Sequence, residues 1–223
     1  MSEWWSYRLE DFLLFAPRVY WRLIEAQNAA LWPLHVASVG AGLAIVLLVA
    51  RRPQNAMPWT GLVLAAVWAF VGWSFLLNRY AAINWAILYI APAFFLQSAL
   101  LAIAAVLPRG LTIDGRAAGG RTGLLVALAG LLLYPCLPLV SGHPWTSAEV
   151  FGIAPDPTAI VTLGLLLAAR GPLLAVLLPI PLFWCLFSGL TLLAMDEVEA
   201  WLLLATAAFV PILVLVGRRR PQT

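Results

Sequence analysis

The sequence contains no lysine, and its thirteen basic residues are all arginine. A Schiff base to retinal or to pyridoxal phosphate requires a lysine amine, and so does the phosphate-binding loop of many nucleotide hydrolases. The absence of lysine excludes these chemistries. It also excludes the opsin-like interpretation that a chain with about seven long apolar segments would otherwise invite.

Ionisable residues are nearly missing from those apolar segments. Of the 223 residues, 63% are hydrophobic and 10% are charged, whereas soluble domains are about 25% charged. A charge at bilayer depth is costly and normally marks an ion path, a proton relay or an active site. The sequence therefore predicts a polytopic membrane protein. It also disfavours ion-coupled transport, because no predicted span carries a titratable carboxylate at its centre.

Signatures of catalysis and of cofactor binding are also missing. The two cysteines, Cys136 and Cys185, have neither zinc-finger nor redox spacing. The sequence has no His-Glu-x-x-His run and no pair of aspartates within the predicted spans. We therefore expect no enzyme activity and no cofactor. The arginines border apolar segments and form no basic stripe, so we expect no nucleic-acid binding.

The apolar segments predict an all-α fold, a bundle of about seven transmembrane helices, with six as the alternative count. The predicted spans are residues 29–50, 59–77, 85–107, 122–140, 157–169, 172–193 and 200–216. The fifth would be only about 20 Å long as a helix, against a hydrocarbon core of about 30 Å. It is either a short shielded span or a re-entrant piece. The intervening segment 108–121 is rich in Gly and Arg and reads as a flexible surface loop.

Three regions follow from this pattern. Residues 1–28 form an amphipathic, aromatic-rich segment that suits the headgroup level of a membrane. Pro17 should divide this segment into two short helices. Residues 29–217 form the transmembrane bundle, and residues 218–223 form a basic cytoplasmic tail.

The arginines favour seven spans and one orientation. Basic residues concentrate in short cytoplasmic loops. Beyond the N-terminal segment, seven spans place nine arginines on one side and only Arg79 on the other, whereas six spans divide them equally. We therefore predict an N-terminus outside and a cytoplasmic C-terminus. The lipid bilayer is then the main partner, with a membrane protein as a possible partner at the outer face.

Three residues on the predicted outer side have side chains that suit a soft metal. His35, Cys136 and His143 are ligand types that copper or zinc accepts. They lie in different segments with no local ligand spacing, so only the fold could bring them together. The alternative is that the two histidines and the thiol serve helix packing and loop structure.

Asp156 is the other candidate, and it permits two interpretations. It lies between Pro155 and Pro157, and Asp followed by Pro is typical of a helix N-terminus. The structural interpretation is that Asp156 caps the short fifth span. The functional interpretation is a carboxylate at the mouth of an outward-facing pocket.

Two blocks of sequence resemble an uncharacterised family of small bacterial multi-pass membrane proteins of unknown function. The first block comprises Trp4-Trp5-Ser6-Tyr7 and Asp11–Phe15, followed by Tyr20, Asn28 and Trp32-Pro33. The second comprises Phe151–Thr158, followed by Leu163-Gly164. The resemblance implies a bacterial plasma membrane. It implies no activity, ligand or catalytic residue.

These observations favour a non-enzymatic accessory, sensing or scaffolding subunit of the membrane. Its outer face, made of residues 1–28 and 141–156, would contact a partner or a ligand. The alternative is a permease for a small neutral or soft-metal solute. That hypothesis draws on the prolines within the spans, because an interior proline can open a cavity or a hinge.

Overall fold

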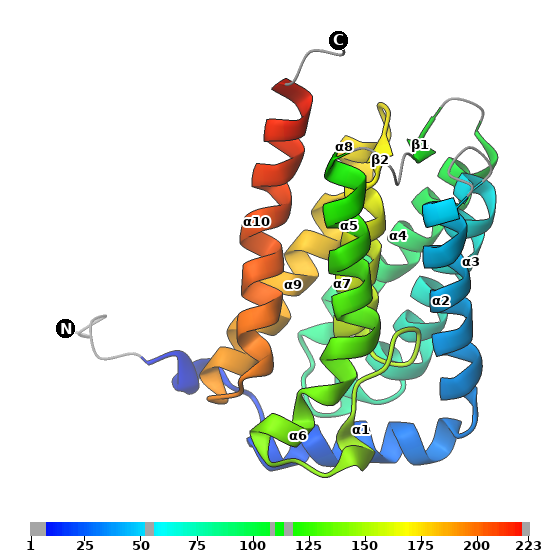
Figure 1. The fold of residues 1–223 in the computed structure, drawn as a ribbon. Coiled ribbons are helices and arrows are strands. Elements are labelled where there is room, and N and C mark those ends of the chain that lie inside the picture. The colour runs from blue at the N-terminus through cyan, green and yellow to red at the C-terminus, as the bar shows by residue number, and fades with distance from the viewer. Residues whose placement is uncertain (1–7, 52–55, 108–109, 114–117, 220–223) are drawn as a thin grey trace.

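The computed structural model describes residues 8–51, 56–107, 110–113 and 118–219, which fold into a single bundle of helices (Figure 1). Six helical segments are long and apolar enough to cross a membrane. They are Leu34–Arg51, Ala56–Ala82, Ile87–Val106, Gly119–Ser141, Leu174–Ala194 and Glu199–Val216. The chain is therefore a multi-pass membrane protein of the all-α class.

Three of these segments are single helices, and three are composite. The single helices are α2 (Leu34–Arg51), α4 (Ile87–Val106) and α10 (Glu199–Arg219). The composite segments start with α3 (Ala56–Val71), α5 (Ala118–Leu128) and α8 (Leu174–Leu177), and the last two end with α6 (Pro138–Ser141) and α9 (Pro179–Ala194). Wider π-helical turns follow α3 over Gly72–Leu77 and α5 over Ala129–Leu133.

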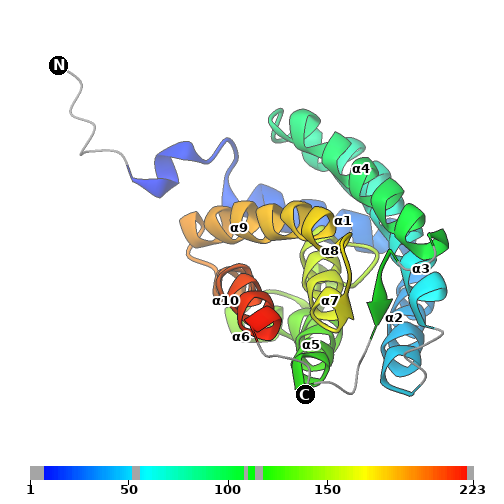
Figure 2. The ribbon, with the colours of Figure 1, turned by 90° about the horizontal axis from the view of Figure 1, so that it is seen from above.

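The short fifth span is a central helix, α7 (Pro155–Leu167). It packs against α3, α5, α9 and α10, and the view along the bundle shows it surrounded by its neighbours (Figure 2). Its residues 155–166 are all buried. Residues 148–154, which lead into it, are non-helical and also buried. Irregular backbone is tolerated at membrane depth only where protein covers it or where it lines a cavity.

This fifth segment runs from one end of the bundle to the other. At its start, the Asn28 side chain donates hydrogen bonds to the carbonyls of Thr146 and Ala148. At its other end, β2 (Ala169–Arg170) pairs in antiparallel fashion with β1 (Thr112–Ile113). In the sequence, β1 lies between α4 and α5. The segment does not return to its starting end, so the re-entrant interpretation is wrong. Together with the six long helices it traverses the bundle seven times, and the six long helices are the ones long and apolar enough to cross a membrane.

The two ends of the bundle differ in what covers them. α1 (Pro17–Leu31) lies across one end of the bundle, transverse to the long helices, and we call this the α1 end (Figure 1). The β1–β2 ladder and the C-terminal end of α10 lie at the opposite end, which we call the β1 end. Three exposed arginines lie at the β1 end, because Arg51 ends α2, Arg121 lies in the first turn of α5 and Arg170 belongs to β2. The chain thus enters and leaves the bundle at opposite ends.

The lead segment divides at Pro17, as the sequence predicts. A single 3-10 turn covers Leu9–Phe12, and Pro17 takes the first position of α1. The buried face of α1 comprises Tyr20, Trp21, Ile24 and Gln27. α1 continues to Leu31, and a cis peptide bond between Trp32 and Pro33 leads into α2. Residues 1–7 of this segment, with Trp4 and Trp5, lie outside the described residues.

The segment between α4 and α5 is less exposed than its composition indicates. Leu111 and Ile113 are buried, and Thr112 and Ile113 pair with β2. The described part of this segment is therefore packed on the bundle rather than a flexible surface loop. The Asp114-Gly115 turn signal lies outside the described residues.

Candidate functional site

The three residues predicted as soft-metal ligands occupy separate environments. His35 Nε2 lies 3.0 Å from Asn28 Oδ1. Cys136 is exposed and its thiol donates to the Leu132 carbonyl, whereas His143 contacts Glu197. Within the described ranges, no group of three or more His, Cys, Asp or Glu residues is arranged to hold a metal ion. The soft-metal hypothesis therefore has no ligand set in this part of the chain.

Asp156 does not cap α7. The N-cap residue is Ala154, Pro155 takes the first helical position, and Asp156 follows in the first turn without a side-chain cap. The capping interpretation is wrong because Pro155, rather than Pro157, starts the helix. The Thr158 hydroxyl satisfies the local backbone instead. It accepts the Gly152 N–H at 2.9 Å and donates to the Ala154 carbonyl at 2.7 Å.

Asp156 lies in the middle of the bundle and is fully buried. Its carboxylate accepts hydrogen bonds from the Tyr134 hydroxyl at 2.9 Å, Trp184 Nε1 at 2.7 Å and the Ser188 hydroxyl at 2.9 Å. Trp184 is equidistant from both ends of the Leu174–Ala194 segment. A titratable carboxylate therefore lies near mid-depth, and the sequence argument that none would do so is wrong.

Two further carboxyls are buried on the α1 side of Asp156. The Tyr20 hydroxyl donates to Glu149 Oε1 at 3.1 Å, and the Ser141 hydroxyl donates to Glu199 Oε1 at 2.7 Å. Glu149 and Glu199 are each only 1% exposed. In both, the second oxygen, Oε2, is buried and has no hydrogen-bond partner among the described residues.

We call Glu149, Asp156 and Glu199 the carboxyl cluster, because their charges influence one another. Burial opposes the ionised form of Glu149, and the neighbouring carboxyls of Asp156 and Glu199 oppose it further. Among the described residues, neither an arginine nor a histidine forms a hydrogen bond or an ion pair with these three carboxyls. The cluster is thus a set of buried acids without a basic partner.

Sequence reasoning missed this cluster because it assigned residues 141–156 to an outer loop. A signal was available in the apolar run Val150-Phe151-Gly152-Ile153, which lies between Glu149 and Asp156. Phe151 and Ile153 are fully buried. A loop exposed to water has no reason to carry such a run, because connecting segments on a protein surface are usually polar.

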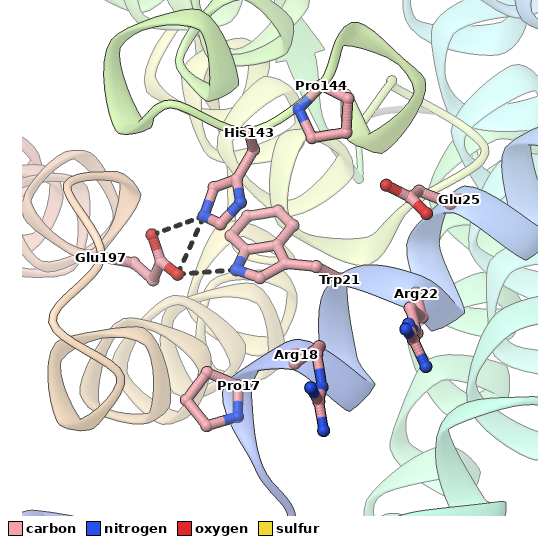
Figure 3. A pocket seen from close by; sticks show the side chains of 8 residues that line it. All are labelled: Pro17, Arg18, Trp21, Arg22, Glu25, His143, Pro144 and Glu197. Carbon is pink, nitrogen blue, oxygen red and sulfur yellow. Dashed lines mark hydrogen bonds and ion pairs between the residues drawn. The ribbon is translucent and has the colours of Figure 1, made fainter.

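A second feature is an open pocket of about 350 Å³ at the α1 end (Figure 3). It joins one face of α1 to the loop after α6 and to the turn between α9 and α10. Its lining residues are Pro17, Arg18, Trp21, Arg22, Glu25, His143, Pro144 and Glu197. The volume lies within the range of small-molecule sites, about 300–1,000 Å³.

Glu197 organises the inner wall of this pocket. Its carboxylate accepts a hydrogen bond from Trp21 Nε1 at 2.6 Å, and both its oxygens lie 3.0 Å from His143 Nε2. The indole of Trp21 packs on the imidazole of His143, with the ring centroids 4.2 Å apart. These contacts fix α1 to the α9–α10 turn, because Glu197 belongs to that turn.

The outer wall of the pocket carries charges that are not paired. Arg18 and Arg22 are exposed and Glu25 is half-buried. Over residues 8–51, 56–107, 110–113 and 118–219, none of the three forms an ion pair. All three project from α1 around Trp21 (Figure 3). The pocket therefore offers two guanidinium groups and one carboxylate to a bound ligand.

The family of the chain follows from its sequence as a whole. Residues 17–223 match a family of unknown function, DUF6064. The chain belongs to this family. The match includes Tyr20, Asn28 and Phe151–Thr158 of the two blocks described above, whereas Trp4–Phe15 precede it.

No curated protein and no solved structure matches the chain. The DUF6064 description itself carries no activity. The functional argument for this DUF6064 chain therefore depends on the carboxyl cluster and on the α1-end pocket.

Proposed function

We propose that this DUF6064 protein is a non-enzymatic accessory or sensing subunit of the membrane, which binds a phosphate-bearing lipid headgroup at its α1 end. The pocket is the observation that supports the proposal. Its walls come from α1 and from the loop after α6, which belong to the two segments that the sequence predicts on the outer face.

The charges in the pocket give the chemistry of the ligand. Arg18 and Arg22 lie one helical turn apart on α1 and have no carboxylate partner among the described residues. Guanidinium groups bind phosphate with paired hydrogen bonds. α1 lies across the end of the bundle, where an interfacial helix meets the headgroups. Glu25 adds a carboxylate that suits the ammonium group of a zwitterionic headgroup.

The orientation of the protein is part of the proposal. The α1 end faces outward and the β1 end faces the cytoplasm. The exposed arginines that belong to the bundle itself, Arg51, Arg121 and Arg170, lie at the β1 end, whereas Arg18 and Arg22 belong to the interfacial helix α1. The resemblance described above adds that the membrane is a bacterial plasma membrane. A partner membrane protein would meet the α1 end. Residues 147–156 would take no part in that contact, because they are buried.

Native mass spectrometry of the purified protein tests headgroup binding. The double variant Arg18→Gln/Arg22→Gln should retain several-fold less phospholipid than the unmodified chain, because it lacks both guanidinium groups. Arg121→Gln removes an exposed arginine at the β1 end and should leave retention unchanged. Equal phospholipid retention by the double variant and the unmodified chain would contradict the proposal.

A second candidate, a permease, is favoured by the broken fifth crossing. Many transporters place their binding sites near the midplane, where interrupted helices meet, and the buried Asp156 lies in the first turn of α7. Uptake of small solutes into proteoliposomes tests this function. If uptake is found, Asp156→Asn should reduce it, whereas the double arginine variant should not.

A further inference from the structure

The carboxyl cluster cannot hold three ionised acids without compensation. Transferring an unpaired carboxylate from water into the apolar interior costs several kcal/mol or more, and buried acids therefore become neutral or acquire a cation. Glu149 and Glu199 each have a buried oxygen with no partner among the described residues. These oxygens are the candidate acceptors for a neutralising group.

The groups that face the cluster supply no positive charge. Tyr20 of α1 donates to Glu149, while Tyr134, Trp184 and Ser188 donate to Asp156. The other groups close enough to feel the charge of Asp156 are Tyr80 and Cys185, which are neutral acids. In the part of the chain that the structure describes, the cluster is surrounded by hydroxyls, an indole and a thiol.

A metal ion does not fit this arrangement. A calcium or magnesium site needs about six oxygen ligands around one point. The three carboxyls influence one another electrostatically, yet no three acidic, histidine or cysteine side chains of the described residues converge on one position. A proton needs only one oxygen, and the unpaired Oε2 of Glu149 offers one.

The hydrogen bonds also distinguish the two deepest carboxyls. Asp156 accepts three hydrogen bonds from neutral donors, and donors of this kind favour the ionised form of a carboxyl. Glu149 accepts one hydrogen bond, from Tyr20. Of the two, Asp156 is therefore the better stabilised anion and Glu149 the better proton carrier.

We infer that the carboxyl cluster is a proton-binding site, in which Glu149 carries an exchangeable proton beside the Asp156 anion. Proton release turns the Glu149 carboxylic acid into a carboxylate and passes the proton to water at the α1 end. Two neighbouring anions then remain in the interior, so release requires the surrounding structure to adjust. This site is separate from the headgroup pocket and does not depend on the function proposed for it.

Tyr20 links the Glu149 carboxyl to α1. Its hydroxyl donates to Glu149, and burial raises the pKa of Tyr20 well above its usual range, so the phenol stays a donor. The adjacent Trp21 donates to Glu197. A change in the charge of Glu149 therefore acts directly on the helix that also forms the pocket.

Infrared spectroscopy of the full chain in lipid tests the site, because a protonated carboxyl and a carboxylate absorb at different frequencies. The unmodified protein should show a protonated-carboxyl band near neutral pH, and Glu149→Gln should abolish it. Asp156→Asn should shift the titration of the band to lower pH, because it removes the neighbouring negative charge. Glu10→Gln, at an exposed acid, should leave the band unchanged.

Two results would overturn the inference. The first is a fully ionised Glu149 at neutral pH, seen as the absence of the band in the folded, unmodified chain. The second is a titration midpoint that falls when sodium replaces choline in the buffer, because a metal cation would then compete for the site. If Glu149→Gln does not fold, the shift in Asp156→Asn and the sodium comparison still decide the question.

Discussion

Asp156 is held by an indole, a phenol and a serine hydroxyl rather than by an arginine. Hydrogen bonds to a charged group contribute about 1.5–3 kcal/mol each, whereas bonds between neutral groups contribute about 0.5–1.5 kcal/mol. If Asp156 is the anion of the cluster, each hydrogen bond donated to it should therefore contribute more to stability than a similar hydrogen bond between neutral groups elsewhere in the interior.

Two buried tryptophans allow this comparison. Trp184 donates to Asp156, and Trp68 donates to the Thr162 hydroxyl at 2.9 Å. Both indoles are fully buried, and both pack against Phe94. Trp184→Phe should therefore destabilise the protein more than Trp68→Phe, by about 1 kcal/mol. Unfolding of both variants in mixed micelles measures the difference, and equal losses would indicate that Asp156 is neutral.

At the scale of helices, the close approach of α5 and α7 holds the central helix in place. A Cβ atom on Gly164 would lie 2.4 Å from the Ala127 backbone nitrogen, and one on Gly123 would lie 2.3 Å from the Gly164 carbonyl oxygen. Both distances are too short for any side chain. Without glycine at these positions, the two backbones would have to separate, and such small-residue contacts are typical of membrane helices.

Gly164→Ala should accordingly destabilise the bundle by about 1–3 kcal/mol, as overpacking of a tight interior does. Gly40→Ala on α2 is the matched control, because nothing lies within 4 Å of its added Cβ atom. The control should be neutral or slightly stabilising, since alanine is the better helix former. Comparable losses of thermal stability in the two variants would contradict this account of the α5–α7 contact.

Most helices could be predicted from the sequence, because long apolar runs determine them with little help from tertiary contacts. The sequence predicts a short span over residues 157–169, but it does not predict that this span is the central helix. Nothing local distinguishes a helix that faces protein on all sides from one that faces lipid. The site was harder to predict. Only folding brings Tyr20, Glu149 and Asp156 together, across more than a hundred residues of chain.

At the scale of the whole molecule, α1 and the end of α10 lie at opposite ends of the bundle, as an odd number of traverses requires. The arginines then predict that the α1 end is outside the cell. Cysteines introduced by Glu10→Cys and Gly119→Cys, both at exposed positions, report on which side of the membrane each end of the bundle lies. Cys136 is exposed and must first be replaced.

In intact cells, a membrane-impermeant maleimide should label the Glu10→Cys variant. It should label the Gly119→Cys variant only after permeabilisation, because that position lies near the β1 end, at the start of α5. Labelling of both variants from the same side would show that the number of crossings is even. Labelling with the opposite preference would show that the bundle is inverted.

The burial of α7 also constrains how the chain is made. A thirteen-residue helix that carries an aspartate in its first turn is a poor substrate for insertion by itself, since a spanning helix needs about 20 apolar residues and an aspartate at mid-depth opposes partitioning. During synthesis, α7 must therefore wait near the translocon until α9 and α10 emerge to enclose it. In a nascent chain that stops after Arg170, α7 would therefore not yet be inserted into the bundle.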